Sequence, residues 1–272
     1  MASSNSASSI KTRFVCISDT HSRYEFSLPD GDILLHGGMC KKLLLVWDGA
    51  NYLLLNIGDF SLTGLESEVV KFLNWLKSLT KYRLKVVIAG NHDLTLQPDF
   101  YKIWWQRWHR AKEDTQSIQN MWNNPELKTK YGIIYLQDQE FIDEQTGFKF
   151  YGSPWQPEFH NWAFNLPHNS EQLEAVWSKI PLNTDILLTH GPPSNILDRT
   201  FTNESAGCEV LTKRLKLVKP KLHVFGHIHE AYGNCESNGT IYVNACTCNL
   251  RYKPVQPPIV IELENPNQIV SC

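Results

Sequence analysis

Short, continuous apolar runs recur along the chain and predict strands that are buried on both faces. These runs occupy residues 13–18, 84–89, 184–189, 221–226, 241–244 and 259–263. Between them, apolar side chains return at helical spacing with polar residues on the other face, which predicts helices at residues 65–79, 170–180 and 207–218. Residues 140–151 predict a hairpin whose turn contains Gly147.

The alternation of strands and helices predicts an α/β sandwich that includes some antiparallel strand pairs. A chain of 272 residues is long enough for one sizeable core, so we expect a single domain over residues 12–264. We expect residues 1–11 to be disordered and residues 265–272 to form a loose C-terminal tail.

Composition narrows the classes of function. The chain holds 26 Lys and Arg against 28 Asp and Glu, without a basic block, so we expect no nucleic-acid partner. A near-neutral chain can still bind phosphate where metal ions supply the positive charge. No apolar run approaches the ~20 residues of a membrane span, and no targeting signal is visible. We therefore expect a cytoplasmic protein that does not bind membranes, whereas its oligomeric state is not constrained.

The seven cysteines are scattered and odd in number, which indicates free thiols in a reducing compartment. Cys246 and Cys248 lie two residues apart. That spacing fits neither a zinc knuckle nor a thioredoxin motif, so it predicts no site.

Metal-binding side chains follow five apolar runs, one of which ends at Ile57. The segments after these runs are Asp19-Thr20-His21, Gly58-Asp59, Gly90-Asn91-His92-Asp93, His190-Gly191 and Gly226-His227-Ile228-His229. Each segment alone is also typical of an ordinary turn, because Asn, Asp and Gly are common turn residues. The carboxyl ends of strands in an α/β sheet converge, however, so five such ends predict one site.

The residue types at these strand ends suit two metal ions. Imidazole and carboxylate ligands suit zinc, manganese and iron, and the absence of thiolate argues against a structural zinc. Two ions ~3.5–4 Å apart would clamp a phosphate and lower the pKa of a shared water. Asp59 is our candidate for the bridging carboxylate that holds them together.

The five motifs, D-x-H, GD, GNHD, H and GHxH, resemble in type and order those of the calcineurin-like metallophosphoesterase superfamily. The resemblance extends from about Phe14 to Leu263 and implies a sandwich of two mixed β-sheets flanked by helices. It also implies the roles of the ligands: Asp19, His21 and His229 for the first metal, Asn91, His190 and His227 for the second, and Asp59 as the bridge.

The same resemblance implies a chemical mechanism. A metal-bridging hydroxide would attack phosphorus in line, and His92 would protonate the leaving oxygen or stabilise the developing charge. Asp93 would orient His92, as a carboxylate behind a catalytic imidazole does.

Residues 152–155, 164–167, 189–193 and 220–226 narrow the resemblance. They are similar to the metallophosphoesterase-domain-containing family, which includes the 239-type brain and fetal-brain proteins of animals. That resemblance implies a phosphodiesterase acting on a small phosphoester, such as a cyclic nucleotide, with two divalent ions. Manganese is favoured, and iron, zinc or magnesium would also fit. Some vertebrate members have Gly where this chain has His227, so its presence favours a competent hydrolase.

Residues 38–57 interrupt the second motif, because in similar proteins the strand at residues 32–36 runs directly into Gly-Asp. Three interpretations remain open. The segment is a retained intron or a gene-model error, or residues 53–57 replace residues 33–36 as the central strand, or it is a loop that leaves Asp59 in place. We expect deletion of residues 38–57 to raise soluble yield and activity.

Trp155, His160 and Trp162 are candidates for a substrate-binding wall that stacks a nucleobase, although a loop packed by its own aromatic residues would show the same pattern. We expect Trp104, Trp105 and Trp108 to form a buried stripe on one helix. The alternative function is a nucleotide-binding or scaffold protein whose metal site is disabled by residues 38–57. A zinc peptidase is disfavoured, because the H-E-x-x-H signature is absent.

Overall fold

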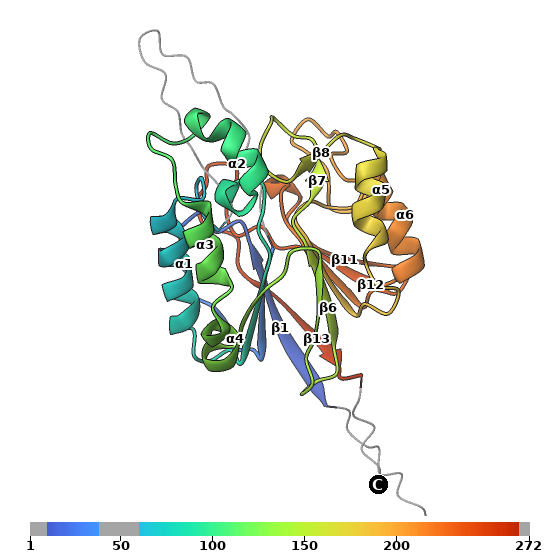
Figure 1. Cartoon of the computed structure of the whole chain (residues 1–272). Helices are drawn as coiled ribbons and strands as arrows, with labels where there is room; N and C mark the ends of the chain where they lie inside the picture. Colours follow the sequence, from blue (N-terminus) through green and yellow to red (C-terminus); the bar gives the residue numbers. More distant parts are fainter. Residues whose placement is uncertain (1–9, 38–59, 267–272) are drawn as a thin grey trace, which may run out of the picture.

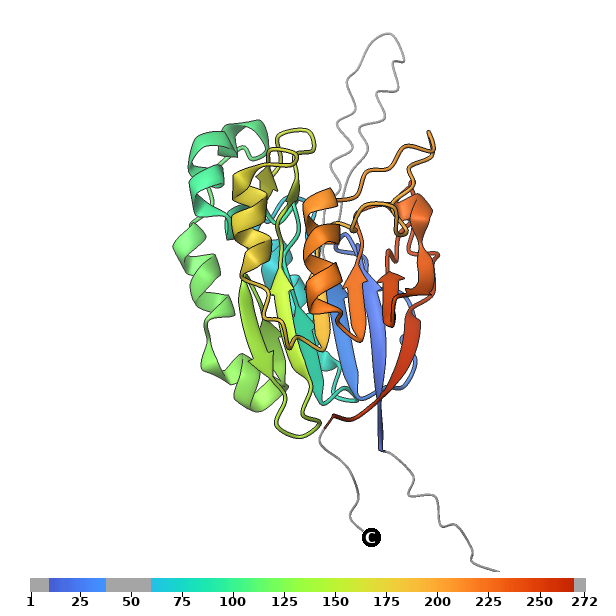
Figure 2. The ribbon, with the colours of Figure 1, turned by 90° about the vertical axis from the view of Figure 1, so that its right-hand side faces the viewer.

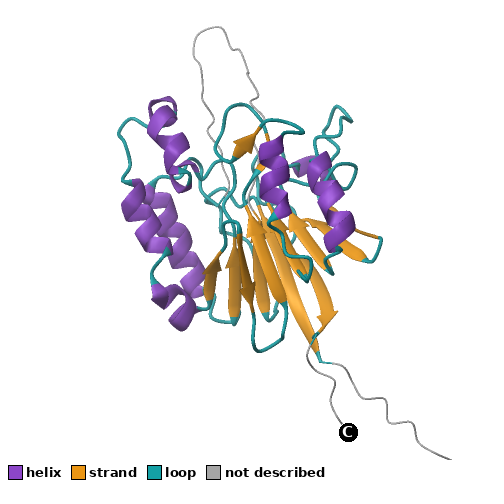
Figure 3. Ribbon diagram, turned by 45° about the vertical axis from the view of Figure 1, so that its right-hand side comes forward, coloured by secondary structure: helices purple, strands orange, loops and turns teal. Residues whose placement is uncertain are grey.

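The computed structural model describes residues 10–37 and 60–266 of the chain. Most of its strands form two large sheets that lie face to face, with helices on both outer sides (Figure 1, Figure 3). This is the predicted sandwich of two mixed sheets flanked by helices. Asp59 and residues 38–57 lie outside the described residues, as do most of the predicted disordered N-terminus and C-terminal tail.

The first sheet has five strands in the order β13-β1-β2-β3-β4. Their bounds are β13 (Ile259–Glu264), β1 (Lys11–Ser18), β2 (Ile33–Gly37), β3 (Leu84–Val87) and β4 (Ile133–Tyr135). Strands β1 to β4 pair in parallel, and β13 pairs antiparallel with β1. The four parallel strands therefore all end at the same edge of the sheet.

The second sheet has six strands in the order β11-β12-β10-β9-β6-β5. Their bounds are β11 (Gly233–Ser237), β12 (Thr240–Asn244), β10 (Leu222–Phe225), β9 (Ile186–Thr189), β6 (Lys149–Ser153) and β5 (Gln139–Ile142). The four inner strands are parallel, and β11 and β5 are antiparallel edges. The predicted hairpin is confirmed by β5 and β6. A separate small sheet pairs β7 (Gln156–Pro157) with β8 (Asn165–Leu166).

Helices cover the outer face of each sheet. The helices beside the first sheet are α1 (Glu66–Ser78), α2 (Pro98–Trp104), α3 (Thr115–Trp122) and α4 (Pro125–Tyr131). Figure 2 shows α5 (Glu171–Ser178) and α6 (Glu209–Val218) in front of the second sheet. Three short 3-10 turns complete the elements: η1 (Leu94–Leu96), η2 (Trp105–Arg107) and η3 (His229–Ala231). Among the described helices, none is long and apolar enough to cross a membrane.

The position of strand β1 between two cores explains why its sequence is continuously apolar. Val15 and Ile17 pack into the core beneath α1 to α4, whereas Phe14 and Cys16 point into the core between the two sheets. Successive side chains of a strand face opposite ways, so both faces are buried and neither can be polar. A third core lies between the second sheet and helices α5 and α6. The strands and helices predicted from these patterns are confirmed to within a few residues.

One open interpretation and one prediction fail. Residues 33–37 form β2 between β1 and β3, which contradicts the interpretation that another segment takes their place as the central strand. The tryptophan stripe also fails: α2 ends at Trp104, which is 45% exposed, and the chain continues as a 3-10 turn. Because the helix changes form there, Trp105 and Trp108 pack on the core without sharing a helical face with Trp104.

Candidate metal centre

The first ligand group gathers at the ends of β1 and β10. Asp19 and His21 follow β1, and His229 opens η3 after β10. All three side chains are buried. The distance from His229 Nε2 to Asp19 Oδ1 is 3.5 Å, and the rings of His21 and His229 lie 5.7 Å apart, centroid to centroid. Asp19 and His21 have φ values of 61° and 51°, so the chain turns sharply enough to present both side chains. The structure therefore brings Asp19 and His229 together, and it packs the His21 ring edge-on against the His229 ring.

The second ligand group is tighter. Asn91 follows β3, His190 follows β9 and His227 follows β10. His190 Nε2 lies 2.6 Å from Asn91 Oδ1 and 3.2 Å from His227 Nδ1. His190 Nε2 thus lies between two other atoms that can bind a metal, although the residues come from both sheets. The structure brings this predicted set together as well.

The loop from His227 to His229 joins the two groups. The backbone N–H of His227 donates to Asp19 Oδ1 at 3.2 Å, so the two groups are adjacent. Asn244 Nδ2, at the end of β12, donates to the carbonyl of Ile228 at 2.8 Å. Since Ile228 stands between the two histidines, Asn244 fixes both of them through the backbone.

The chemistry of these residues fits divalent cations. Burial raises the pKa of the Asp19 carboxyl, partly offset by His229, and Asp19 Oδ2 has no hydrogen-bond partner among the described residues. A buried carboxylate oxygen without a partner is costly unless a cation or hydrogen bond compensates it. Imidazole, amide and carboxylate donors beside it suit zinc, manganese and iron. The predicted bridge, Asp59, lies outside the described residues, so its role stays a prediction.

His92 is fully buried beside Asn91. Its Nδ1 lies 3.1 Å from the carbonyl oxygen of Leu62, which as an acceptor favours the tautomer with hydrogen on Nδ1. The loop that carries Leu62 is itself held by Glu68 of α1, which accepts from the backbone N–H groups of Leu62 at 2.8 Å and Thr63 at 3.1 Å. A carboxylate in the first turn of α1 thus supports the histidine indirectly.

The Asp93 carboxylate bonds to two loops. Its carboxylate accepts from the Ser61 hydroxyl at 2.6 Å and from the Gly90 backbone N–H at 2.9 Å. Burial raises the pKa of the Asp93 carboxyl well above its ordinary value. The Leu62 carbonyl thus contacts His92 Nδ1, and Asp93 ties the loop at Gly90 to the loop at Ser61; that Asp93 also orients His92 stays a prediction.

The three candidate substrate-binding residues separate in the structure. Trp162 is buried and stacks on the His92 ring at 3.5 Å between centroids. Trp155 donates from Nε1 to Asp138 at 2.9 Å. His160 alone of the three lines a pocket of about 330 Å³ that opens over His227 and His229. Phe159, Phe201, Leu250 and Tyr252 also line this pocket.

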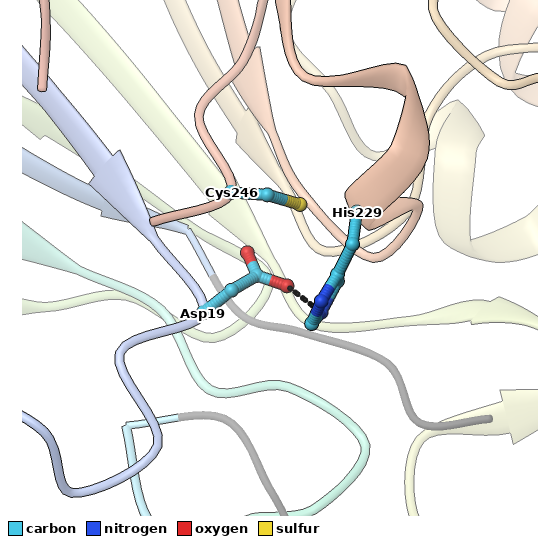
Figure 4. Close-up of side chains that lie close together, drawn as sticks. All are labelled: Asp19, His229 and Cys246. Atoms are coloured by element: carbon cyan, nitrogen blue, oxygen red, sulfur yellow. Dashed lines mark ion pairs between the residues drawn. The ribbon is translucent and has the colours of Figure 1, made fainter. Parts of the chain in front are cut away.

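Cys246 lies beside Asp19 and His229, although the sequence predicts no site there. Ligand atoms of Asp19, His229 and Cys246 all lie within 4.8 Å of one another, and all three residues are buried. In Figure 4 the Cys246 sulfur lies on the side of the Asp19 carboxylate and His229 ring. The signal was available in principle, because Cys246 follows the apolar run at residues 241–244 just as the predicted ligands follow other runs. Its spacing from Cys248 matches no metal motif built from a cysteine pair, so the pair by itself predicts no site.

The fold and the ligand sets define a metallophosphoesterase. The sequence model of the calcineurin-like phosphoesterase family matches residues 12–231, and the chain belongs to that family. It is 43% identical to human metallophosphoesterase domain-containing protein 1 over 94% of this chain and 72% of the human protein. A UPF0046 protein of Caenorhabditis elegans is 36% identical over 92% of this chain and 60% of that protein.

Solved structures share the fold at low sequence identity. Phosphopantetheinyl hydrolase from Mycobacterium tuberculosis aligns with a TM-score of 0.53 at 14% identity, covering 95% of this chain and 98% of that chain. TT1561 of Thermus thermophilus aligns with a TM-score of 0.50 at 12% identity, covering 94% and 99%. At these identities the likeness supports the architecture alone. The family membership, by contrast, implies metal-dependent hydrolysis of a phosphoester.

Proposed function

We propose that this chain is a dinuclear metal-dependent phosphodiesterase that hydrolyses a small phosphodiester, such as a cyclic nucleotide. The observation that carries the proposal is the convergence of two ligand groups on one another. Asp19 Oδ1, which belongs to the first group, accepts the backbone N–H of His227, which belongs to the second. Ions bound by two groups that adjoin in this way would supply the arrangement that phosphoester hydrolysis by metal pairs uses.

Asp19, His21 and His229 would hold one ion, and Asn91, His190 and His227 the other. When bound, the two ions would supply Lewis acidity toward phosphate oxygens and lower the pKa of water between them. The carboxylate of Asp19 offsets part of the positive charge. The four histidines of the two groups bind as neutral imidazoles, which is the protonation state that a metal ligand needs.

His92 would serve the leaving group. Its Nδ1–H is committed to the Leu62 carbonyl, so as an imidazolium His92 would give its Nε2 proton to the departing oxygen and become the neutral tautomer with hydrogen on Nδ1. Stacking on Trp162 holds the plane of the ring while the carbonyl fixes its rotation. Both supports lie outside the ligand groups, and we expect them to act on the step that breaks the phosphorus–oxygen bond.

The pocket beside the second group would receive the ester. His160 and Phe159 form one part of its wall, and Phe201 and Tyr252 another. The Phe159 ring meets the His227 ring edge-on at 5.4 Å between centroids, so an organic group in this pocket would lie next to a metal ligand. Aromatic walls favour a flat or apolar substituent over a bare phosphate.

Turnover of bis(p-nitrophenyl) phosphate by the purified chain with added manganese tests this function. We expect hydrolysis by the wild type and a loss of ~100-fold or more in kcat for His92→Ala. Lys213→Ala, an exposed change on α6, is the matched control and should keep full turnover. The monoester p-nitrophenyl phosphate, assayed in parallel, should be the poorer substrate.

An inert wild-type chain with each of manganese, zinc and iron(II) would refute the hydrolase. If that inert chain still bound a cyclic nucleotide, the result would favour the nucleotide-binding alternative. Equal rates for the wild type and His92→Ala would remove His92 from the mechanism and leave the metal pair to be tested by itself.

A further inference from the structure

We propose that Cys246 is a thiolate ligand of the first metal position, together with Asp19 and His229, and that this position selects a thiophilic divalent ion such as zinc over manganese. The inference rests on the proposed metal-dependent function for its setting. It deepens that function by naming the class of cation, and it concerns a residue that the family's five motifs do not include.

The backbone fixes where the Cys246 sulfur lies. Residues 245–247 continue from β12 and pair with Ser18, the last residue of β1: Ser18 N–H donates to the Ala245 carbonyl at 2.8 Å, and Thr247 N–H donates to the Ser18 carbonyl at 2.8 Å. Ser18 directly precedes Asp19. The same two backbone hydrogen bonds therefore fix the positions of the Cys246 thiol and the Asp19 carboxylate relative to each other.

The separations suit a small metal site. Bonds of ~2.0–2.2 Å to oxygen and nitrogen and ~2.3 Å to sulfur, at tetrahedral angles, place ligand atoms ~3.3–3.7 Å from one another. The 3.5 Å between Asp19 Oδ1 and His229 Nε2 already matches. Ligand atoms of all three residues lie within 4.8 Å of one another, so the sulfur needs to come closer to the other two atoms by at most ~1.5 Å.

A second, independent observation points to a cation at this place. Asp19 is fully buried, and its Oδ2 has no hydrogen-bond partner among the described residues. A divalent ion would satisfy that oxygen. One carboxylate and one thiolate would also balance the ion's two positive charges, with His229 neutral. On binding, the Cys246 thiol gives its proton to solvent, so the bond exchanges S–H for S–metal without any redox step.

The thiolate changes which ion is preferred. Soft sulfur ligands favour zinc over harder manganese, which prefers carboxylate, carbonyl and water. The second group offers only nitrogen and amide oxygen, so the two positions should differ in selectivity. Zinc or iron at the first position with a harder ion at the second is the expected pairing.

Cobalt substitution tests the assignment without measuring catalysis. The metal-stripped full-length chain is titrated with Co²⁺, and the near-ultraviolet absorption that marks charge transfer from thiolate to cobalt is recorded. We expect this band in the wild type and in Cys248→Ser, and its loss in Cys246→Ser. Cys248 is a matched control, because it is as buried as Cys246 but is not in the group with Asp19 and His229. Its sulfur instead lies 4.0 Å from the Thr20 carbonyl oxygen.

Competition between zinc and manganese gives the second readout. Cys246→Ser should weaken zinc binding by at least ~10-fold and change manganese binding little, and Cys246→Ala should do the same. Near-ultraviolet circular dichroism of the metal-free variants establishes that each is folded. If both variants show the same change in zinc affinity, the change comes from loss of the sulfur and not from the particular side chain that replaces it.

Cobalt bound without a charge-transfer band in the wild type would overturn the proposal. So would a band that survives in Cys246→Ser, or a ratio of zinc to manganese affinity that this change leaves unaltered. Turnover is recorded on the same samples to separate the two claims. A chain that shows the band but hydrolyses nothing keeps the cysteine ligand and loses the phosphodiesterase, whereas an active chain without the band does the reverse.

Discussion

The two ligand groups draw on the same two sheets, yet they differ in compactness and in donor atoms. His190 Nε2 lies at hydrogen-bonding distance from both Asn91 Oδ1 and His227 Nδ1. Asp19 and His229 are farther apart, and a cysteine sulfur lies beside them. The second group thus resembles a preformed nitrogen and oxygen site. The first group carries the charge, holds a buried oxygen without a partner and adds a soft donor.

This difference indicates that similar strand ends at one edge of a sandwich can carry two candidate metal positions with different donor atoms. Asp19 carries the carboxylate of the first group, whereas Asn91 occupies the corresponding strand end in the second. Because a carboxylate binds a cation more strongly than an amide does, we expect the first position to dominate affinity. The following predictions test that contrast in order of expected effect.

Asp19→Asn should have the largest effect. Asparagine keeps an oxygen that can accept the His227 backbone N–H, so the loop geometry is retained while the charge is lost. We expect turnover of a phosphodiester to fall by at least ~100-fold. Asp30→Asn is the matched control, because that carboxylate is 93% exposed and lies away from the ligands. If Asp19→Asn kept wild-type turnover, the first group would not be a catalytic metal position.

Trp162→Ala should have the next largest effect. Removing the ring that stacks on His92 frees the imidazole to tilt, and misplacement by ~1 Å can cost ~100-fold in rate. We expect kcat to fall by ~10–100-fold with KM little changed, and Trp162→Phe to restore most of it. Trp104→Ala, on the exposed side of α2, should leave both constants unaltered. A rise in KM alone would instead return Trp162 to the substrate-binding role that the sequence suggested.

Asn244→Ala should weaken both ligand groups moderately. The change removes the donor that holds the Ile228 carbonyl between His227 and His229, and it leaves buried carbonyls without a partner. We expect metal affinity to fall by ~10-fold and the free energy of unfolding by about 1–3 kcal/mol. Asn234→Ala, on exposed β11, serves as the control. Metal titration followed by calorimetry checks both effects, and an unchanged affinity would limit Asn244 to a structural role.

The smallest expected effect is a dependence of the free energy of unfolding on pH, caused by two buried histidines. Burial lowers the pKa of His36 and of His223 from 6.5 to about 3. His36 bonds Thr20, beside Asp19, and His223 bonds Thr189, beside His190. As pH falls from 6.5 toward 3, the unfolded chain takes up protons that the folded chain does not, so stability decreases.

We expect each histidine to contribute up to ~1.4 kcal/mol per pH unit to that slope in the metal-free protein. Denaturant unfolding at several pH values measures it. His36→Gln and His223→Gln should each flatten the slope by one proton. A slope that neither change alters would mean that both histidines already bind protons in the folded chain.

Local patterns in the sequence were sufficient to predict the strands and the turns that carry the candidate ligands. Strand β1 is apolar on both faces because two cores meet across it, and Asp19 and His21 directly follow its end. The partner of Asp93 could not be predicted, because Ser61 is distant in sequence and nothing local distinguishes a carboxylate that supports His92 from one that joins two loops. The stacking of Trp162 on His92 also depends on long-range packing.

The neighbours of Cys246 likewise could not be predicted from local sequence. Its position after an apolar run was visible, but its neighbours, Asp19 and His229, are brought to it only when β12 continues alongside β1. The bridging role of Asp59 and the nature of residues 38–57 stay predictions, since both fall outside the described residues. Deletion of residues 38–57 with measurement of soluble yield and activity remains the direct test of that segment.

The number of divalent ions bound per chain tests the two-position centre most directly. The protein is saturated with zinc or manganese, excess metal is removed, and bound metal is counted by elemental analysis against protein concentration. We predict two ions for the wild type and one each for Asp19→Asn and Asn91→Ala. A wild type that binds no more than one ion, or variants that both still bind two, would contradict a centre built from these two groups.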